Sequence, residues 1–353
     1  MKTDLNNLAA RTGEWLRGGG AENDIVVSSR IRLARNLTSY PFTSRATAEQ
    51  RGELEAILSE RIMKVDIAEG AAYLNLNELS PIERMLLVER HLISRELSAA
   101  EGDRGVAFTP DEVISIMVNE EDHLRIQVMR CGYELEDTWR IVNEVDNKLE
   151  HVLQFAFSTK LGYLTACPTN VGSGMRLSVM LHLPALVSTR HLEKVVNAVA
   201  KLNLVVRGLY GEGTQASGDF YQISNQVTLG KSERDIIQSM QDVIPRVLEY
   251  ERKAREGLLT DNRKKVEDRV WRAVGILRMA RFITSEETMH LLSQVRMGVN
   301  MGLVTSIDLK TINEILSQTL PAHLQKMNGR DLDSEERNIV RADFVRARMA
   351  KVS

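Results

Sequence analysis

The 353-residue chain is poor in cysteine and lacks any long hydrophobic run. Cys131 and Cys167 are its only cysteines, too few for the disulfide framework of a secreted protein, and this favours a reducing compartment. Residues 1–15 are too polar for a signal peptide, and no apolar run approaches the roughly 18 residues of a membrane-spanning helix. These absences predict a cytoplasmic protein with no membrane partner.

Several well-known catalytic motifs are also missing. No G-x-x-x-x-G-K-[ST] segment occurs, which excludes a P-loop protein, and the H-R-D, V-A-I-K and D-F-G segments of ordinary protein kinases are absent. The cysteine and histidine spacing favours no zinc site, and we assign no metal ligand to the protein. The formal net charge of −2 gives no general attraction to nucleic acid, so no direct nucleic-acid partner is expected.

Length and pattern favour two domains, because 353 residues are many for one core. The residues from 260 onward are net basic, whereas the earlier ones are net acidic. Helical patterns fill residues 263–282, 286–298, 307–318 and 334–350, with little strand signal between them. We therefore predict an α+β domain over residues 1–256 and an all-α domain over residues 257–353.

Particular elements are expected within the first domain. Ser80-Pro81-Ile82-Glu83 combines a capping box with a proline at the first helical position, which predicts a helix to about Leu97. Apolar spacing predicts a second helix over 136–157, and Ser232 should cap a third that ends near Arg255. Alternating or β-rich runs predict strands at 113–118, 124–128, 175–183, 204–206 and 220–229.

The first candidate site is an arginine pair in a strand-like segment, Ser28-Ser29-Arg30-Ile31-Arg32. In a strand, Arg30 and Arg32 point to the same face. Two neighbouring guanidiniums repel each other unless they share an anion, and phosphate is the natural one. Taken alone, the segment fits a solvated strand edge equally well.

The second candidate is an acidic turn, Asn119 to Arg125, which reads Asn-Glu-Glu-Asp-His-Leu-Arg between two apolar runs. Crowded carboxylates repel one another, and a cationic ligand would offset that cost. One carboxylate could hold or deprotonate a cationic nucleophile while Arg125 faces a phosphate. A solvated turn is the alternative, and His123 lies in no H-E-x-x-H pattern, so we expect it to be structural.

Two glycine-rich loops complete the set. In residues 164–176, Gly172 and Gly174 would let backbone N–H groups approach an anion, and Arg176 lies where a strand begins. Cys167 in this loop is either a reactive thiol or a small buried hydrophobic residue. The second loop, Arg207-Gly208-Leu209-Tyr210-Gly211-Glu212-Gly213, combines an arginine with a carboxylate, but a plain hairpin turn is as good an interpretation.

Together and in this order, the segments SSRIR, NEEDHLR, CPTNVGSG and RGLYGEG closely resemble the phosphagen (guanidino) kinase family, over roughly residues 24–255. That family transfers the γ-phosphoryl group of MgATP to a guanidinium nitrogen, on an antiparallel sheet flanked by helices. The resemblance implies ATP and Mg²⁺ as cofactors, with Mg²⁺ held through the nucleotide phosphates.

The resemblance also implies residue roles. Glu121 and Glu212 would hold the guanidinium, with Glu121 as the proton acceptor, and Cys167 would be the reactive cysteine beside it. Tyr210 stands where the family often has a second arginine. Nucleotide-binding roles are implied for Ser28, Ser29, Arg30, Ile31, Arg32, His91, Arg125, Arg176, Arg207, Gly208 and Gly211.

Two further features narrow the resemblance. Members that act on free arginine or creatine have a helical domain before SSRIR, which begins here at Ser28, so we expect that domain to be absent. The helices after residue 257 resemble the second domain of the branch that phosphorylates arginine side chains of proteins. That domain carries an R-D-x-x-R-A motif associated with allosteric phosphoarginine binding, and the matching residues here are Arg337, Asn338, Arg341 and Ala342. A solvated basic face is the alternative for this pair of arginines.

The resemblance finally implies partners: protein substrates with exposed arginines (a stress-gene repressor and misfolded proteins), an activating zinc-binding adaptor, and the Clp protease machinery. It thereby implies roles in stress response and protein quality control. Val270, Val274, Leu277 and Phe282 have helical spacing and could pair two chains into a homodimer. The alternative functions are an inactive phosphoarginine-binding regulator and a kinase of a small free guanidino compound.

Overall fold

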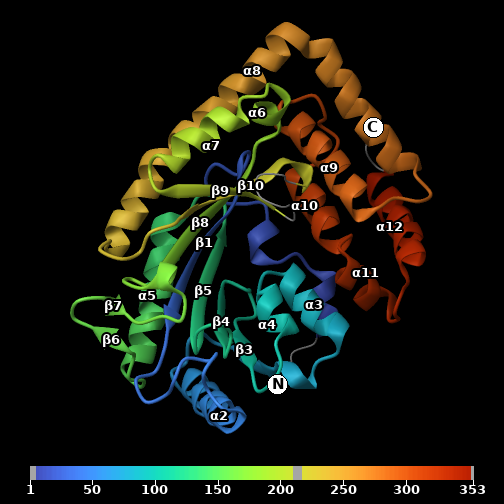
Figure 1. Ribbon diagram of the computed structural model, residues 1–353. Coiled ribbons are helices and arrows are strands. Elements are labelled where there is room, and N and C mark those ends of the chain that lie inside the picture. Colours follow the sequence, from blue (N-terminus) through green and yellow to red (C-terminus); the bar gives the residue numbers. More distant parts are fainter. Residues whose placement is uncertain (1–4, 210–216, 351–353) are drawn as a thin grey trace.

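The computed structural model describes residues 5–209 and 217–350 (Figure 1). An eight-stranded sheet, antiparallel throughout, forms its centre. The strands in spatial order are β2 (Ala72–Asn75), β3 (Gly105–Phe108), β4 (Ile114–Val118), β5 (Leu124–Cys131), β1 (Val26–Arg35), β8 (Met175–His182), β10 (Phe220–Asn225) and β9 (Leu204–Gly208). Helices flank this sheet and a helical region follows it, so the predicted fold class is confirmed.

One face of the sheet carries the main apolar core. Because side chains alternate along a strand, Ile31 and Leu33 of β1 point away from Arg30 and Arg32 and are fully buried. The helices that pack on this core are α2 (Ala48–Lys64), α5 (Leu135–Glu150), α7 (Leu192–Ala200) and the first part of α8 (Glu233–Met279). The opposite face is thereby left to the polar side chains of the same strands.

Helices also cover apolar parts of that opposite face. Met180 and Phe220 pack with the second part of α8 and with α9 (Ser285–Asn300), α10 (Leu309–Gln318) and α12 (Ser334–Met349). On the other flank, Phe108 and Met117 pack with α1 (Leu5–Ala10), α3 (Pro81–Glu89), α4 (Arg95–Ala99) and α11 (Pro321–Asn328). A polar strip therefore remains between two helical walls.

Helix α8 connects the sheet to the C-terminal helices. It continues well past the predicted end near Arg255, and the boundary predicted at residue 256 falls inside it. Figure 1 shows the helix bent into two arms, and the backbone of Asn262 departs from helical geometry, with φ −137° and ψ 25°. Among the described residues, no helix combines the length and apolar character needed to cross a membrane.

Two other helix predictions were too long. The helix beginning at Pro81 ends at Glu89, because His91 adopts a left-handed backbone (φ 59°), and a separate helix follows from Arg95. Helix α5 ends at Glu150 although the apolar pattern continues. The later apolar residue Phe155 is buried too, but it lies in an extended segment and pairs with Leu37. Apolar spacing alone did not distinguish this segment from a helix.

The predicted dimer-forming side chains are mostly internal. Val270, Val274 and Leu277 are at most 2% exposed and pack against the other C-terminal helices. These three side chains fill the core of their own chain, so the hypothesis that they form a surface pairing two chains is wrong for them. Phe282 alone of the four is exposed, at 52%.

Candidate active site

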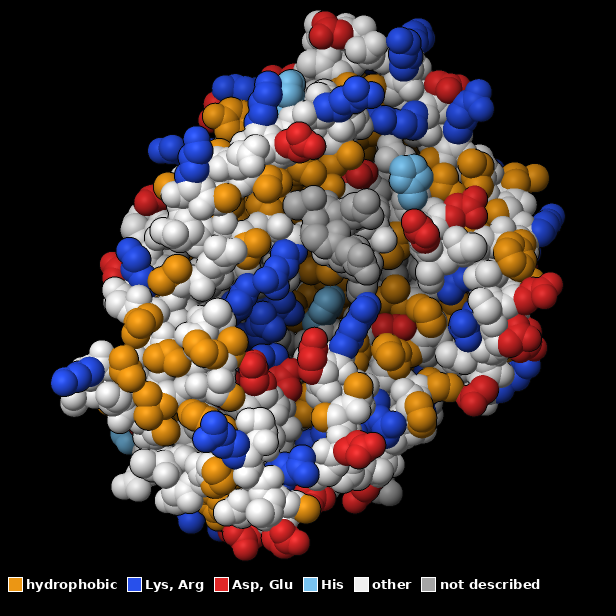
Figure 2. Space-filling model, in the orientation of Figure 1, with side chains coloured by type: hydrophobic (Ala, Val, Ile, Leu, Met, Phe, Trp, Pro, Cys, Tyr) orange, Lys and Arg blue, Asp and Glu red, His pale blue; other side chains and the backbone are white. Residues whose placement is uncertain are grey.

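The polar strip brings arginines from four strands onto one face of the sheet. Arg32 of β1 pairs directly with Arg176 of β8, and Arg125 of β5 lies opposite Ala34 on the other side of β1. Arg207 of β9 pairs with Gln222 of β10. Figure 2 shows Lys and Arg side chains gathered in a hollow near the middle of this face, with Asp and Glu side chains on the adjoining rim.

The hollow is a cleft of about 570 Å³. Its lining combines the arginines with carboxylates, a thiol and small polar groups. The residues are Arg32, Ala34, Ser94, Glu96, Ala100, Glu120, Glu121, Arg125, Cys167, Thr169, Asn170, Gly174, Arg176, Arg207 and Gln222. All four of the predicted segments therefore contribute at least one residue to this one cleft.

Burial and mutual repulsion act on the arginines of this cleft. Burial, followed by the neighbouring charges of Arg125 and Arg176, lowers the pKa of Arg30 to about 10. Burial, followed by the charge of Arg30, lowers the pKa of Arg32 well below its usual value, and Nε of Arg32 has no hydrogen-bond partner among the described residues. The pKa of Arg176 is also lowered, by burial and then by Arg207. Such a cluster is suited to a polyanion, because an anion would relieve both effects.

The acidic turn between β4 and β5 divides its three carboxylates. Glu120 is buried and pairs with Arg125 at 2.6 Å, and it also accepts a hydrogen bond from the hydroxyl of Ser94. Glu121 is more exposed and lies 3.7 Å from Arg125. Burial raises the pKa of Glu121, the charges of Asp122 and Glu120 add to the effect, and Arg125 opposes it. Glu121 is thus the carboxylate of the turn best placed to accept a proton from a ligand.

The remaining residues of the turn are structural. Asp122 accepts hydrogen bonds from the side chain of Asn36 (2.6 Å) and from the backbone N–H of Ala166 (2.7 Å), and so ties the turn to the loop that carries Cys167. His123 is buried, with Nδ1 accepting from the N–H of Leu37 and Nε2 2.9 Å from the carbonyl of Pro41. These contacts agree with the structural role expected for His123.

Cys167 lies at the cleft side of the glycine-rich loop. Its Sγ is 3.0 Å from Oγ1 of Thr169, and the thiol is half-buried, not enclosed in an apolar core. The hydroxyl of Thr228 lies 2.9 Å and 2.7 Å from the carbonyl oxygens of Thr169 and Val171 and holds the loop from behind. The expectation of a buried small hydrophobic residue therefore does not describe Cys167.

Some predicted nucleotide-binding residues lie outside the cleft lining. Arg30 contacts the lining residue Gln222, to which its guanidinium donates at 2.8 Å. Ile31 belongs to the apolar core on the other face. Ser28 is buried in β1, and the hydroxyl of Ser29 donates to the carbonyl of Gly132 at the far end of the strand.

His91, Gly208 and the second loop require separate description. His91 is half-buried near Arg30 and Arg32, and loss of solvation, followed by these charges, lowers its pKa to about 3. Its ring is edge-on to Trp15, at 4.4 Å between centroids. Gly208 ends β9. Tyr210, Gly211 and Glu212 lie outside the described residues.

Arg35, which follows the arginine pair, points away from the cleft. Its Nε and Nη2 donate to the two carboxylate oxygens of Asp146 at 3.1 Å and 2.7 Å, and its guanidinium carbon lies 3.5 Å from the ring centroid of Tyr163. The same alternation that unites Arg30 and Arg32 puts Arg35 on the opposite face. It is a buried structural ion pair.

The predicted allosteric residues lie on α12. Arg341 is buried, and its guanidinium donates to the carbonyls of Thr319 (2.8 Å) and Ile283 (3.1 Å) and to Oδ1 of Asn338 (2.6 Å). Burial, followed by the charge of Arg337, lowers the pKa of Arg341 to about 10. Arg337 is half-buried and donates to the carbonyl of Leu332, while Ala342 is buried.

Sequence reasoning missed several residues of the site, and three of them hold its charged side chains. Gln222 lines the cleft and holds Arg30, and its only sequence signal is a polar residue in the alternating pattern of β10. Ser94 donates to Glu120 from the connection between two helices, where no motif identifies it. Asn36 holds Asp122 and also donates to the carbonyl of Leu164.

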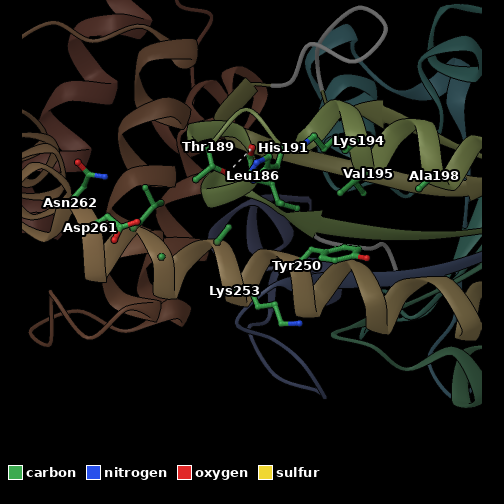
Figure 3. Close-up of a pocket in the computed structure, with 13 residues that line it drawn as sticks. Leu186, Thr189, His191, Lys194, Val195, Ala198, Tyr250, Lys253, Asp261 and Asn262 are labelled. Atoms are coloured by element: carbon green, nitrogen blue, oxygen red, sulfur yellow. Dashed lines mark hydrogen bonds between the residues drawn. The ribbon is translucent and has the colours of Figure 1, made fainter.

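A second cavity, of about 600 Å³, lies between α6 (Pro184–Ser188), α7 and α8 (Figure 3). Val195 and Ala198 of α7 face Tyr250 of α8 across it. Its walls are mainly apolar, and none of the predicted site residues lines it. The chemistry of phosphate binding therefore belongs to the arginine cleft.

The cleft suits the phosphate chain of a nucleotide. Among residues 5–209 and 217–350, no group of three or more His, Cys, Asp or Glu side chains is arranged to hold a metal ion. The unpartnered Nε of Arg32 and the three arginines with lowered pKa instead fit a phosphate chain. Fold and cleft together define a phosphotransferase that acts on a cationic acceptor.

Comparisons with known proteins agree with this class. The ATP:guanido phosphotransferase C-terminal catalytic domain matches residues 53–254, and the protein-arginine kinase McsB C-terminal domain matches residues 263–353. A protein-arginine kinase of Symbiobacterium thermophilum is 48% identical over 98% of this chain and 99% of its own length. One of Desulforamulus reducens is 47% identical over 96% of both.

Solved structures give the same result. A lombricine kinase has a TM-score of 0.58 and 25% identity, covering 72% of this chain and 77% of its own. A taurocyamine kinase of Schistosoma mansoni has a TM-score of 0.59 and 30% identity, covering 65% of this chain and 33% of its own. The chain therefore belongs to the ATP:guanido phosphotransferase family, among the protein-arginine kinases. As the family name states, ATP is the phosphoryl donor.

Proposed function

We propose that this protein transfers the γ-phosphoryl group of ATP, with Mg²⁺, to arginine side chains of other proteins. The observation that carries the proposal is the cleft in which Arg32, Arg125 and Arg176 on the sheet face Glu121 and Cys167 at the rim. A phosphate chain needs the first group of residues and a guanidinium needs the second. The near full-length similarity to protein-arginine kinases supports a protein substrate over a free guanidino compound.

The proposed chemistry begins with the acceptor. A guanidinium has a pKa above about 12 and is a poor nucleophile until a proton leaves. Glu121 accepts that proton, and its raised pKa makes it a stronger base than an ordinary carboxylate. The freed nitrogen attacks the γ-phosphorus, the bond to the β,γ-bridging oxygen breaks, and ADP leaves.

The arginines supply charge stabilisation. Arg32, Arg125 and Arg176 hold the phosphate oxygens in line with the acceptor nitrogen, and Arg207 closes the β9 side. Arg30, held by Gln222, supports Arg32 from the neighbouring position on β1. Mg²⁺, for which no protein ligand is assigned, would add positive charge to the phosphate side when bound with the nucleotide. Cys167 lies on the guanidinium side. By resemblance to the family, Glu212, which is outside the described residues, would share the binding of the guanidinium.

The test is incubation with ATP, Mg²⁺ and a folded arginine-rich protein, followed by mass spectrometry under non-acidic conditions. We expect phosphoarginine on the protein with the wild type, and almost none with Glu121→Gln. The exposed, distant Glu69→Gln is the matched control and should behave as the wild type. Faster turnover on free arginine than on the protein would reverse the choice of substrate. No acid-labile phosphate from the wild type would support an inactive phosphoarginine-binding regulator.

Regulation is proposed to come from α12. Arg337 and Arg341 lie one turn apart, and a phosphoarginine would be gripped mainly by Arg337, because two carbonyls and Asn338 already engage Arg341. Arg337→Ala should change activation by added phosphoarginine more than it changes the basal rate. A fall in basal rate as large as that of Glu121→Gln would contradict this assignment.

The remaining parts of the proposal concern the cell. The protein acts in the cytoplasm as a homodimer, is activated by a zinc-binding adaptor, and marks misfolded proteins and a stress-gene repressor for a Clp protease. Sedimentation at micromolar concentration tests the dimer, and a monomer there would refute it. Loss of Clp-dependent degradation of an arginine-phosphorylated substrate with Glu121→Gln would support the marking role.

A further inference from the structure

A buried polar contact links the C-terminal helices to the base of the β9–β10 hairpin. Ser293 of α9 is fully buried, and its hydroxyl donates to Oδ2 of Asp219 at 3.0 Å. Nε2 of His182, also fully buried at the end of β8, lies 2.9 Å from the same hydroxyl oxygen. One serine therefore joins residues that belong to the sheet region.

The direction of these hydrogen bonds follows from their chemistry. A carboxylate only accepts, so the Ser293 hydroxyl donates to Asp219 and accepts from Nε2–H of His182. Burial, together with the charges of Arg296 and Arg255, lowers the pKa of His182 well below its usual value and keeps the ring neutral. The three groups thus form one ordered chain of donors and acceptors.

The backbone at Asp219 is held in an uncommon conformation. Asp219 has φ 60° and Gly218 has φ 69°, and a left-handed backbone is strained for a residue other than glycine. A Cβ on Gly218 would lie 2.9 Å from the carbonyl oxygen of Met289 in α9. The turn at Gly218 and Asp219 therefore packs directly against α9, and a shift of α9 would move the turn.

This turn leads directly into the active site. Asp219 precedes β10, whose Gln222 lines the cleft and holds Arg30. Two backbone hydrogen bonds join the two sides of the hairpin. The N–H of Leu209 donates to the carbonyl of Phe220 (2.9 Å), and the N–H of Ser217 donates to the carbonyl of Leu209 (3.1 Å). The conformation of Asp219 consequently sets where β10 begins relative to the arginines of the cleft.

We propose that Ser293 and Asp219 are positioning residues. Through them, α9 fixes the β9–β10 hairpin relative to the arginines of the cleft on β1, β5 and β8. This inference rests on the proposed function, in which Arg207 and Gln222 of that hairpin line the active-site cleft. The C-terminal helices then complete the active site as well as carrying a regulatory surface. Arg207 of the hairpin also lines the cleft, but Arg32, Arg125 and Arg176 stand on β1, β5 and β8, so ATP binding should weaken less than turnover when the link is removed.

The variant that tests the link is Ser293→Ala, which removes the shared hydroxyl. Thr288→Val is the matched control, because it also removes a buried hydroxyl from α9, but one that bonds only to the carbonyl of Thr284 in the preceding turn. Ser293→Thr keeps a hydroxyl, so we expect a smaller change from the wild type than with Ser293→Ala. Each full-length variant is compared with the wild type in amide hydrogen exchange and in kinetics.

We expect faster exchange in peptides covering 204–209 and 217–225 for Ser293→Ala alone. With a protein substrate, its kcat should fall about 10- to 100-fold, as for misplaced catalytic groups, while the KM for ATP rises by a smaller factor. Equal exchange and kinetics in Ser293→Ala and Thr288→Val would overturn the proposal. If the wild type phosphorylates no protein, the proposed function fails, yet the exchange comparison still decides whether α9 holds the hairpin.

Discussion

Arg32 and Arg176 face each other across the β1–β8 ladder as directly paired residues. Burial lowers the pKa of both, and neighbouring guanidiniums lower it further. Like charges held this close cost free energy until an anion lies between them. The cleft is therefore organised for its ligand before the ligand arrives, at some expense to the stability of the free protein.

Replacing Arg32 should weaken ATP binding without lowering the stability of the free protein. Arg32→Ala removes a cation whose Nε is unpartnered among the described residues, so the midpoint of thermal unfolding without ligand should stay constant or rise. ATP affinity should fall by about 2–4 kcal/mol, because a charge-assisted phosphate contact is lost. Calorimetry and thermal denaturation measure the two effects, with the exposed Arg45→Ala as control. Marked destabilisation of Arg32→Ala would show that its charge is compensated within the free protein.

Arg35 should behave in the opposite way. It is bound to Asp146 and stacked on Tyr163, both away from the cleft. Arg35→Ala leaves a buried carboxylate without its partner and should cost about 3–5 kcal/mol in the free energy of unfolding. Urea denaturation gives this value, and Arg35→Met combined with Asp146→Leu should recover much of it. Unchanged stability in Arg35→Ala would mean that water replaces the guanidinium.

The pH dependence of the reaction should report Glu121. Burial, Asp122 and Glu120 raise its pKa, so the carboxylate gains its proton at a higher pH than an ordinary glutamate. A proton acceptor must be ionised, and kcat should therefore fall as pH decreases through this raised value. In Glu121→Gln the residual rate should be lower by about 10²- to 10⁴-fold and should lose this acidic limb. An acidic limb that persists in the variant would assign it to another group.

Local pattern was sufficient for the elements that carry the site. Apolar runs on either side of the acidic turn predicted β4 and β5, and the period of two in β1 predicted that Arg30 and Arg32 share a face. The same period assigns Arg35 to the other face, but only the fold reveals Asp146 as its partner. The period of a strand thus predicts which face a side chain points to, but not which residue it contacts there.

Long-range contacts account for what the sequence did not predict. The three acids of the turn look alike in sequence, and contacts to Ser94 and Asn36 give Glu120 and Asp122 their separate roles. Val270 was predicted to lie on an outer face because helical spacing shows that a face is apolar, not which element covers it. The helix that covers it, α9, begins only at Ser285.

The crossing of α8 and α9 allows a last test with two glycines. Gly298 is buried in α9, and a Cβ there would lie 2.4 Å from Cγ1 of Val270, whose short branched side chain is fully buried. Gly275 of α8 is exposed, and a Cβ there would meet nothing within 4 Å. Gly298→Ala should cost about 1–3 kcal/mol through overpacking. Gly275→Ala should stabilise the protein by up to about 1 kcal/mol, because alanine is the better helix former.

Thermal denaturation of the two variants should therefore give shifts of opposite sign. Combining Gly298→Ala with Val270→Ala distinguishes overpacking from other causes, because the smaller side chain makes room for the new methyl group. We expect the loss in the double variant to be smaller than the sum of the two single losses. Additive losses, or stabilisation by Gly298→Ala alone, would mean that α8 and α9 separate easily at this crossing. In that case α9 would be too loosely held to fix the β9–β10 hairpin.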